Sequence, residues 1–415
     1  MRSKKISFIH HGRVIGGAPT SLKNTIVGLK NEGFTNLKIL CAFPDMKPFF
    51  EKEAGVGTGD IYSPHLVVGR VFVGLASLAS LRTFIYFWLE ILKAPYTIWR
   101  QIQRLKSEKP DIIHLNSSIL FIAAISAKWL GIPLVWHVRE VLIGGKWNLR
   151  KRFAGWFIRS LADRVICISE VEAKSLGRDT KGNLSVVYNF IDLEKFAQSC
   201  GDAESEKERY DIRDQKVYVS LGGVSFRKGT VEIIHAAKKM PEAHFLIAGT
   251  YPEKTSHSYF KKKMIGFYHA LEDVLIQYKI KDIYSWYYNQ RVEFLYFGTE
   301  LENLKFVGKL DNVAPLINIC DALIFAGRTP HFPRPVYEAW ALKKPVVVFD
   351  MEGVGDNVSD GIDGVVCKSN DTDGLIDAIK SVKPEMGEGG YQKALEKFDM
   401  EKNVKKIVGV YGELL

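Results

Sequence analysis

The sequence predicts an α/β protein built from two doubly wound domains, on the strength of three observations. The chain has 415 residues, which is more than a single hydrophobic core usually organises. Its composition is globular, with 47% hydrophobic and 25% charged residues. Short apolar segments alternate with amphipathic ones along most of the chain. This alternation is typical of parallel sheets covered by helices on both faces.

The first half of the chain alternates expected buried strands with helices. Strands are predicted at 5–11, 37–43, 111–115, 133–138, 164–168 and 184–188. Helices are predicted at 21–33, 119–131 and 148–162, and Thr20 or Ser21 could cap the first of them.

A polar stretch at 197–215 interrupts this alternation, which then resumes. Further strands are predicted at 216–223, 243–249, 304–308, 321–327 and 344–350, with helices at 230–240, 312–320 and 335–342. We therefore expect domains at 1–195 and 196–398, with a C-terminal helix at 399–415 that could return to the N-terminal domain. A Tyr- and Lys-containing segment at 250–300 is expected to form either an extra helical subdomain or a partner contact.

Charge and cysteine usage restrict the partners and the compartment. A formal net charge of +10 favours anionic company, such as nucleic acid, acidic lipid or phosphorylated small molecules. No recognisable nucleic-acid module is present, so nucleic acid is the least favoured of these. The five scattered cysteines form no CxxC pair, which is typical of reduced thiols in a cytoplasmic protein. The apolar part of the N-terminal MRSKKISFIHH is too short for a signal sequence.

In parallel sheets ligands bind beyond the carboxyl ends of the strands, so the loops there are the places to search for a site. The first such loop is HHGRVIGGAPTSL, in which Gly16 and Gly17 allow a ligand to approach the backbone at the start of a helix. The loop is neither GxGxxG nor a Walker loop, and an ordinary tight turn is an equally good interpretation.

The second loop is SLGGVSFRKGTVEII, where Arg227 and Lys228 precede a helix. Two cations beside the free N–H groups of a helix N-terminus make a cradle for phosphate. A solvated basic turn is the alternative interpretation.

The third segment, TPHFPRPVYEAWALKKPVVVFD, contains a single acid, Glu338, in an apolar setting. Pro335 suits the first turn of a helix, which would place Glu338 in or near that turn. The carboxylate could simply stabilise the helix dipole. Alternatively, it could accept hydrogen bonds from the vicinal hydroxyls of a nucleotide ribose.

Residues 70–100 combine apolar and aromatic side chains with basic ends. Arg82 and Glu90 interrupt the stretch and Pro95 is expected to break its helix, so a membrane span is disfavoured. Together with the basic KWNLRKRFAGWFIRS, the stretch suits a surface helix lying on an anionic membrane. Two ordinary helices, one in the core and one solvated, are the alternative.

In its order of motifs nearly the whole chain resembles the retaining glycosyltransferases of family 4, which have the GT-B fold. The matching segments are IGGAPTSL, PDIIHLNS, PLVWHVRE, ADRVICISE, VVYNFIDLEKF, VSLGGVSFRKGTVEIIHAA, LKFVGKLDNVAPLINICDALIFAG and RPVYEAWALKKPVVVFDMEGVGDNVSDGIDGVV. The resemblance implies two Rossmann-like domains facing a central cleft, with acceptor binding in the first and nucleotide-sugar binding in the second. The membrane-associating helices expected above would belong to the first domain.

The resemblance also implies roles for individual residues. Glu338 matches the second glutamate of the family's E-x7-E motif, which binds ribose, and Lys228 matches the lysine that neutralises the donor diphosphate. His137 matches a histidine near the donor sugar, and with Arg227 these residues form the expected catalytic set. The expected donor-binding set is Gly16, Gly17, Gly223, Arg334, Pro335, Val336 and Asp356. Arg139 and Glu140 are expected either to bind acceptor or to pair with each other.

Three positions depart from the family pattern. The first glutamate of E-x7-E would fall at Pro330, a frequent arginine falls at Gly223, and Phe190 replaces a glycine in VVYNFIDLEKF. Sugar recognition is therefore expected to differ, and Arg227 and Arg334 could replace the missing cation.

The expected reaction transfers a sugar from a nucleoside-diphosphate sugar to a glycan or a polyprenyl-diphosphate-linked acceptor. If residues 70–100 lie on a membrane, the acceptor is expected to be lipid-borne, and the reaction then belongs to polysaccharide or lipopolysaccharide synthesis at the cytoplasmic membrane face. Fixed cations suit the developing negative charge, so neither a metal nor a cofactor is expected. The alternatives are a non-catalytic nucleotide-sugar binder and another GT-B enzyme, such as an epimerase or a phosphorylase.

Overall fold

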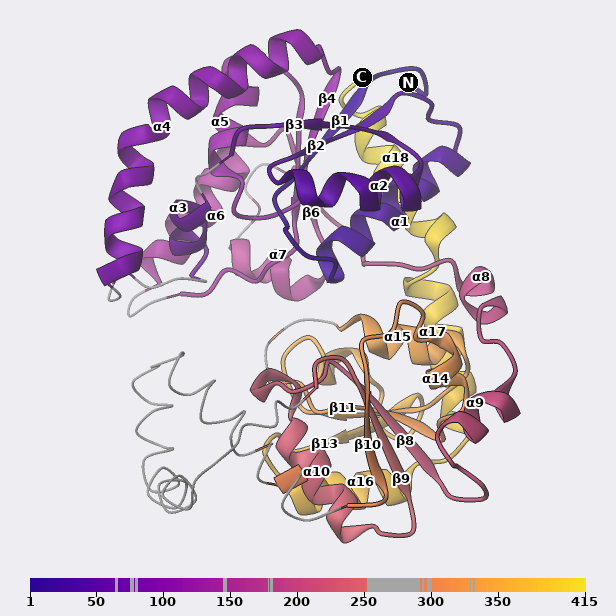
Figure 1. Cartoon of the computed structure of the whole chain (residues 1–415). Helices are drawn as coiled ribbons and strands as arrows, with labels where there is room; N and C mark the ends of the chain where they lie inside the picture. The colour runs from indigo at the N-terminus through magenta and orange to yellow at the C-terminus, as the bar shows by residue number, and fades with distance from the viewer. Residues whose placement is uncertain are drawn as a thin grey trace. The chain divides into compact units, whose positions relative to one another are not determined.

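The computed structural model describes residues 1–63, 66–74, 78, 81–144, 148–177, 179, 182–251, 292, 295–296, 301–328, 330 and 333–415. The chain divides into two compact units (Figure 1). Unit 1 comprises Met1–Asp192 and Lys397–Leu415, and unit 2 comprises Leu193–Glu396. Most of the segment at 250–300 lies outside the described residues.

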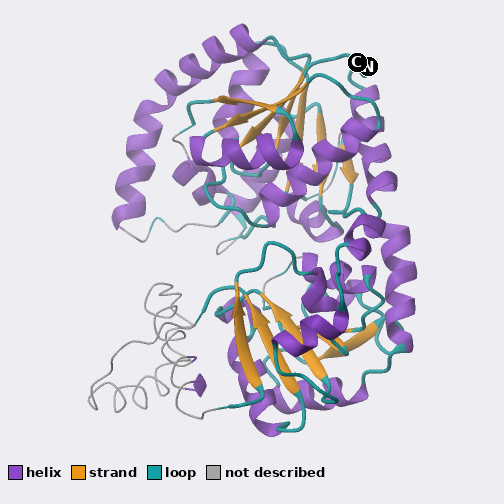
Figure 2. Cartoon of the chain, turned by 45° about the vertical axis from the view of Figure 1, so that its right-hand side comes forward, coloured by secondary structure: helices purple, strands orange, loops and turns teal. Residues whose placement is uncertain are grey.

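Unit 1 contains a parallel sheet of seven strands in the order β3-β2-β1-β4-β5-β6-β7. Figure 2 shows the strands in orange and the helices in purple. The strands are β1 Ile6–His10, β2 Leu37–Cys41, β3 Gly57–Asp60, β4 Ile112–Leu115, β5 Leu134–Val138, β6 Arg164–Cys167 and β7 Leu184–Val186. The strand order reverses between β1 and β4, and such a reversal is where doubly wound sheets bind ligands.

Helices flank this sheet. They are α1 Gly17–Asn31, α2 Lys47–Ala54, α3 Leu66–Phe72, α4 Leu81–Glu108, α5 Phe121–Trp129, α6 Leu149–Leu161, α7 Glu170–Leu176 and α18 Met400–Gly412, with a 3-10 turn at Pro44–Met46. Helix α1 begins earlier than predicted, because Gly16 rather than Thr20 or Ser21 is the residue before its first turn.

Unit 2 contains a parallel sheet of six strands in the order β10-β9-β8-β11-β12-β13. The strands are β8 Val217–Leu221, β9 His244–Ala248, β10 Leu304–Gly308, β11 Ala322–Phe325, β12 Val346–Phe349 and β13 Gly364–Cys367. The helices are α8 Leu193–Gln198, α9 Ala203–Arg209, α10 Thr230–Lys239, α14 Ala314–Asn318, α15 Arg334–Ala341, α16 Thr372–Ser381 and α17 Glu385–Lys397, with 3-10 turns η2 Phe226–Lys228 and η3 Gly355–Asn357. The order reverses between β8 and β11.

Most strands form where the sequence supplies a short apolar run bounded by turns, whereas β3, with the sequence GTGD, does not. The VVVF of β12 is fully buried, as a central strand of a doubly covered sheet requires. The polar stretch 197–215 is partly helical, which the sequence did not predict. Asp202 begins α9 by accepting a hydrogen bond from the Ser205 N–H.

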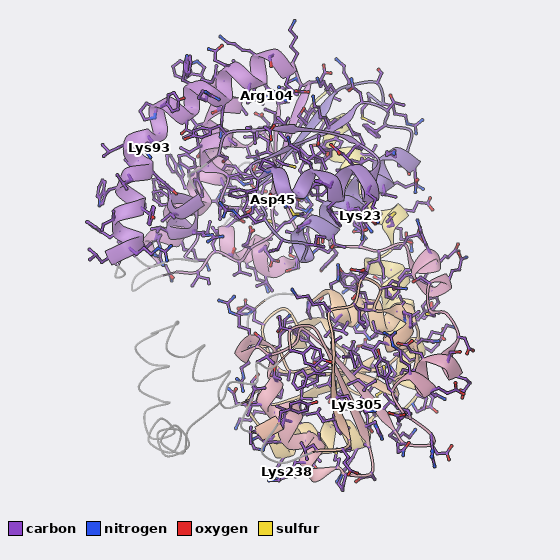
Figure 3. The ribbon with its side chains drawn as sticks, viewed as in Figure 1. Lys23, Asp45, Lys93, Arg104, Lys238 and Lys305 are labelled. Carbon is purple, nitrogen blue, oxygen red and sulfur yellow. The ribbon has the colours of Figure 1, made fainter. Side chains whose placement is uncertain are left out.

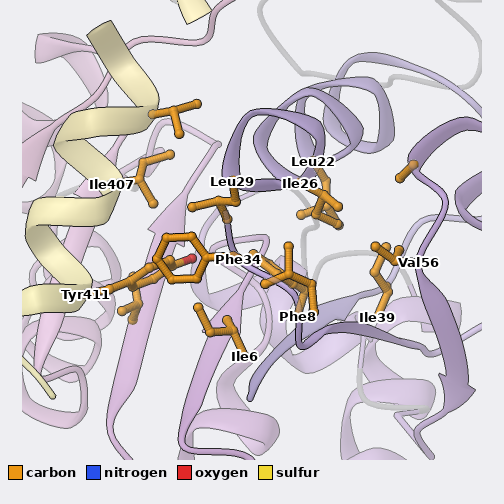
Figure 4. Close-up of a cluster of buried hydrophobic side chains, with 14 of the residues drawn as sticks. Ile6, Phe8, Leu22, Ile26, Leu29, Phe34, Ile39, Val56, Ile407 and Tyr411 are labelled. Carbon is orange, nitrogen blue, oxygen red and sulfur yellow. The ribbon is translucent and has the colours of Figure 1, made fainter. Parts of the chain in front are cut away.

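The C-terminal helix α18 completes the core of unit 1 beside α1 (Figure 4). Ile407 and Tyr411 of α18 pack in one buried cluster with Leu29 and Phe34. Phe190, which stands where the family has glycine, joins the same cluster and has no left-handed backbone, so no glycine is needed there. The departure at Phe190 therefore serves packing.

Helix α4 continues through Pro95, against the expectation that the helix breaks there. Proline removes the hydrogen bond to the carbonyl of Ile91, one turn earlier. Both residues lie on the exposed side of the helix, where water can solvate that carbonyl. Within the described residues, no helix combines the length and the hydropathy needed to cross a bilayer.

Close contact between α1 and α18 predicts a specific stability effect. A Cβ added at Gly28 would lie 2.3 Å from Cγ2 of Val404, so Gly28→Ala should lower the free energy of unfolding. We expect a loss of about 1–3 kcal/mol, typical of overpacking, measured by chemical denaturation.

Two variants control this prediction. Adding Val404→Ala to Gly28→Ala should recover part of the loss, because it removes the clashing methyl. Gly409→Ala in α18 faces open space and should be neutral or stabilising by up to about 1 kcal/mol. Equal destabilisation by Gly28→Ala and Gly409→Ala would show that the α1–α18 contact is not tight.

Candidate active site

Two histidines and a tyrosine form a buried hydrogen-bonded chain in unit 1. His114 lies in β4 and His137 in β5, and both side chains are buried. The Tyr411 hydroxyl, from α18, lies 2.7 Å from Nδ1 of His114. Nε2 of His114 lies 3.1 Å from Nδ1 of His137. Nε2 of His137 is buried and has no hydrogen-bond partner in the described part of the chain.

Arg139 determines the direction of this chain. Its Nη2 lies 3.5 Å from Nδ1 of His137, and a guanidinium can only donate. Nδ1 of His137 is therefore an acceptor, and it receives the Nε2–H of His114. His114 in turn accepts from Tyr411 at its Nδ1. The neutral His137 consequently carries its proton on Nε2, the atom without a partner.

Burial keeps both imidazoles neutral. It lowers the pKa of His114 to about 3, and Arg139 adds to the effect. The pKa of His137 is also held well below its ordinary value, first by burial and then by Arg139 and His114. His137 thus offers a ligand a hydrogen-bond donor.

Arg139 is itself held by two asparagines. Its Nε donates to Oδ1 of Asn116 at 2.5 Å, and its Nη1 donates to Oδ1 of Asn189 at 2.8 Å. Asn116 follows β4 and also contacts Nδ1 of His10, at the end of β1. These residues gather at the carboxyl ends of β1, β4 and β5, beside the reversal in strand order.

Glu140 holds the loop after β4. One carboxylate oxygen accepts from the Ser117 hydroxyl at 2.7 Å, and the other accepts from the Ser118 N–H at 2.8 Å. Glu140 thus makes its contacts to this loop, and Arg139 makes its own to asparagines. Acceptor binding by Arg139 and Glu140 stays a prediction.

The glycine pair of unit 1 borders open space. A Cβ added at Gly16 or Gly17 would meet no atom within 4 Å. The N–H groups of the first turn of α1 lie there, so the loop can receive an anionic or hydroxylated ligand.

In unit 2, Lys228 lies across the glycine loop that follows β8. A Cβ at Gly222 would lie 2.8 Å from Cγ of Lys228, so this glycine makes room for the lysine stem. Gly223 has φ of +63° and packs on the backbone of Thr250. Gly229, with φ of +65°, directly precedes α10. Gly223 therefore has a structural role in addition to the expected donor contact.

The electrostatic environment of Lys228 is unusual for a lysine. Its Nζ lies 4.5 Å from the centroid of the Phe325 ring, at the end of β11. Burial lowers its pKa to about 8, and the nearby cations Arg227 and Arg334 add to the effect. An anion bound here would be attracted to three positive groups.

Glu338 is buried in α15 with one half of its carboxylate unsatisfied. Oε1 accepts from Nε of Arg334 at 2.9 Å, whereas Oε2 is buried without a partner among the described residues. Burial raises the pKa of the carboxyl, and Arg334 opposes the shift. Glu338 is the fifth residue of its helix, beyond the first turn in which a dipole effect is strongest. A ligand hydroxyl would satisfy Oε2 directly.

The remaining residues expected to bind the donor in unit 2 lie beside Glu338 in α15 or in the 3-10 turns η2 and η3. Pro335 is in the first turn of α15, as predicted, and Val336 beside it is buried. Asp356 is exposed in η3 after β12, where Oδ2 accepts from the Gly353 N–H at 3.2 Å. Arg227 is exposed, and its carbonyl accepts from the Arg328 N–H.

The sequence did not reveal several polar partners in these sites. His114 and Asn116 are two positions apart in an extended segment, so their side chains lie on the same face of β4 and the residues that follow it. This spacing could have been recognised in PDIIHLNS. Tyr411 is separated from His114 by 297 positions, which no local pattern reports. In unit 2, Arg328 forms a partly buried ion pair with Glu232, which holds the loop after β11 against α10.

The fold defines the class of protein. The crystal structure of Anabaena HepE in complex with UDP and glucose matches with a TM-score of 0.73 at 18% identity, covering 99% of each chain. A glycosyltransferase from Rickettsia africae matches with a TM-score of 0.72 at 15% identity, covering 99% of this chain and 98% of that one. The expected fold class is confirmed as GT-B.

Family models identify the group within that class. The model for Glycosyltransferase Family 4 matches residues 15–195, and that for Glycosyl transferases group 1 matches residues 285–393. An uncharacterized glycosyltransferase of Methanocaldococcus jannaschii is 23% identical over 334 residues, covering 77% of this chain and 79% of that protein. The Escherichia coli UDP-Gal:alpha-D-GlcNAc-diphosphoundecaprenol alpha-1,3-galactosyltransferase is 22% identical over 330 residues, covering 75% and 77%. The chain belongs to the family 4 type of glycosyltransferases.

The hydrogen-bond chain predicts the tautomer of His137. Two-bond ¹H–¹⁵N spectra of histidine-labelled protein should show neutral His137 protonated on Nε2 throughout pH 5–8. A proton on Nδ1, or titration of His137 in this range, would contradict the assigned chain.

Removing the tyrosine hydroxyl tests the same assignment. Tyr411→Phe should lower the free energy of unfolding by about 0.5–1.5 kcal/mol, because Nδ1 of His114 loses its donor, and should leave the tautomer of His137 unchanged, because Arg139 still donates to Nδ1 of His137. Tyr62→Phe, at an exposed tyrosine, is the matched control and should change neither quantity.

Proposed function

We propose that this glycosyltransferase is a retaining enzyme that transfers a sugar from a nucleoside diphosphate to a glycan or a polyprenyl-diphosphate-linked acceptor, in polysaccharide or lipopolysaccharide synthesis. The observation that supports it best is the unsatisfied Oε2 of Glu338, in the same unit as the Lys228 loop. HepE was crystallised with UDP, and the E. coli relative is named for a lipid-linked acceptor.

Glu338 and Lys228 would divide the recognition of the donor. The free Oε2 of Glu338 accepts a hydrogen bond from a ribose hydroxyl, while Arg334 holds Oε1 and so fixes the direction of the carboxylate. Lys228, Arg227 and the N–H groups at the start of α10 attract the diphosphate. With Pro330 in place of the first glutamate, selection of the sugar must use other groups.

The proposed chemistry places charge where unit 2 has cations. Breaking the bond between the anomeric carbon and the diphosphate oxygen leaves positive charge on the sugar and negative charge on the diphosphate. Fixed positive groups stabilise the latter, which is usually the largest contribution to such catalysis. Because these cations already oppose the diphosphate charge, we propose that no metal is required, and activity in excess EDTA tests this.

Retention of configuration places the incoming hydroxyl on the face from which the diphosphate departs. A diphosphate oxygen is then the nearest base for the acceptor's proton. The new bond joins the acceptor oxygen to the anomeric carbon as the bond to diphosphate breaks. Since His137 has its proton on Nε2, we assign it as a hydrogen-bond donor to the donor sugar and not as the base.

The direct test is turnover. Purified full-length protein is incubated with a panel of nucleoside-diphosphate sugars, with and without a polyprenyl-diphosphate-linked sugar, while release of nucleoside diphosphate is followed. We expect one donor to react, and the anomeric configuration of the product, determined by NMR, to match that of the donor. Inversion would exclude the retaining assignment, and tight binding of a donor without turnover would favour a non-catalytic binder.

Glu338 supplies a binding test that does not depend on the acceptor. Glu338→Ala should weaken binding of the reactive nucleotide sugar by about 10- to 100-fold, the effect of losing a hydrogen bond to a charged group. Calorimetry measures the affinity and circular dichroism checks the fold. Asp373→Ala, at an exposed carboxylate of α16 paired with Lys239, should leave affinity unchanged. Unchanged affinity in Glu338→Ala would refute the ribose contact.

The pKa of Lys228 predicts a pH dependence. Because burial and neighbouring cations lower that pKa to about 8, the lysine is charged below pH 8 and loses its charge as pH rises through that value. Above about pH 7, where UDP is fully ionised, affinity for UDP should therefore fall as Lys228 deprotonates, by about tenfold at one unit above the pKa.

A substitution separates Lys228 from other titrating groups. Lys228→Arg keeps the positive charge at high pH, because arginine does not deprotonate in this range, and should flatten the profile. If the profile of Lys228→Arg still falls above pH 8, another group is responsible.

A further inference from the structure

Helix α4 presents an extended apolar face to solvent. Between Leu81 and Trp99, Phe87 is the one large apolar side chain in the buried class, and the others are partly or largely exposed. Exposure reaches 73% at Leu81, 77% at Leu92 and 54% at Trp99. We call the exposed apolar side chains of residues 81–99 the α4 outer face. Monomeric soluble proteins rarely expose an apolar patch of this extent without a partner.

The helix does not need this face for folding. Phe87, Thr97, Gln101 and Leu105 form the narrow buried stripe that packs against unit 1, at helical spacing. After residue 100 the solvent side becomes polar, with Gln103, Lys106 and Ser107 exposed. The apolar surface is therefore confined to the first part of one continuous helix.

Aromatic contacts link the α4 outer face to two more helices of unit 1, α3 and α6. A chain of ring contacts runs from Trp88 through Phe87, Phe72 and Phe153 to Trp156, with centroid separations between 5.3 and 6.2 Å. Phe72 belongs to α3, and Phe153 and Trp156 to α6. Phe87 is buried and Phe72 is half-buried, so these rings join the helices beneath the surface, while Trp88 on α4 and Trp156 on α6 are exposed.

Exposed cations lie on α4 and α6 near the α4 outer face, whereas the acid Glu90 of α4 is hydrogen-bonded to the start of α3. Arg82, Lys93 and Arg152 are exposed, and Lys93 is seen on α4 in Figure 3. Glu90 is the one acid in the sequence between Leu81 and Ser107. Its carboxylate accepts hydrogen bonds from the N–H groups of Val67 and Val68 at the start of α3. The exposed groups are therefore aromatic, aliphatic and cationic.

We propose that the α4 outer face, with Trp156 of α6, docks on a bilayer rich in anionic lipid. Tyrosine and tryptophan prefer the level of the headgroups, aliphatic side chains enter the acyl boundary, and arginine and lysine bind the anionic headgroups. A second copy of the chain fits less well, because a symmetric contact would bring the same cations together. The surface does not depend on the sugar transferred, and its test measures no turnover.

Flotation with vesicles tests the proposal on the full chain. The protein should float with vesicles containing phosphatidylglycerol, stay at the bottom of the gradient with pure phosphatidylcholine, and be partly released by salt. Leu92→Glu combined with Trp99→Glu should reduce partitioning by at least about tenfold, since it places charge in the acyl boundary. Ile362→Glu, at a 66% exposed aliphatic residue of unit 2, is the matched control and should float like the parent protein.

The cations are tested separately. Arg82→Gln with Lys93→Gln should weaken partitioning by about fivefold for each charge removed. Lys238→Gln with Lys239→Gln removes the same net charge from exposed positions in unit 2 and should have little effect. Circular dichroism confirms that each variant is folded.

Three outcomes would overturn the proposal. The parent protein could remain unbound with both vesicle types, or the α4 variants could float as well as the controls do. Light scattering could instead show an oligomer that Leu92→Glu dissociates, which would assign the face to a second copy of the chain.

Discussion

A buried polar atom must find a hydrogen-bond partner, and leaving one without a partner costs about 1–3 kcal/mol. Among the residues that the structure describes, Nε2 of His137 in unit 1 and Oε2 of Glu338 in unit 2 are buried without a partner. In both cases the rest of the side chain is held by an arginine or another histidine, so the unsatisfied atom has a fixed direction. A ligand acceptor at His137, or a ligand hydroxyl at Glu338, would supply the hydrogen bond that each unit leaves unmade.

The supporting groups matter because they restrict what each atom can do. Arg139 can only donate, and so its contact with His137 excludes a proton on Nδ1. Arg334 occupies one oxygen of Glu338 and leaves the other for a ligand. Burial, with the cations Arg227 and Arg334, lowers the pKa of Lys228 to about 8, so its charged form is less favoured than that of an ordinary lysine. Binding of a diphosphate and protonation of Lys228 are therefore expected to reinforce each other.

The proposed membrane docking of α4 depends on how the helix divides its apolar side chains between packing and solvent. A narrow buried stripe is enough to pack α4 against the rest of unit 1. Most of its aromatic and aliphatic side chains therefore remain exposed to solvent. Glu90, the group that would repel an anionic surface, instead serves the first turn of α3. Folding and docking use opposite sides of the same helix.

The sequence by itself determined the two-domain α/β class, the glycine loops and the positions of Lys228 and Glu338, because alternation, turns and short motifs are local properties. The sequence did not predict features that depend on contacts between residues distant in the chain. The start of α1 at Gly17 and the continuation of α4 through Pro95 depend on surroundings that propensity does not describe. Tyr411 reaches His114 only because α18 packs beside α1, and Asn116 and Asn189 meet only around Arg139. Tertiary structure alone fixed the proton on His137 and the free oxygen of Glu338, since hydrogen-bond direction is set by partners distant in the chain.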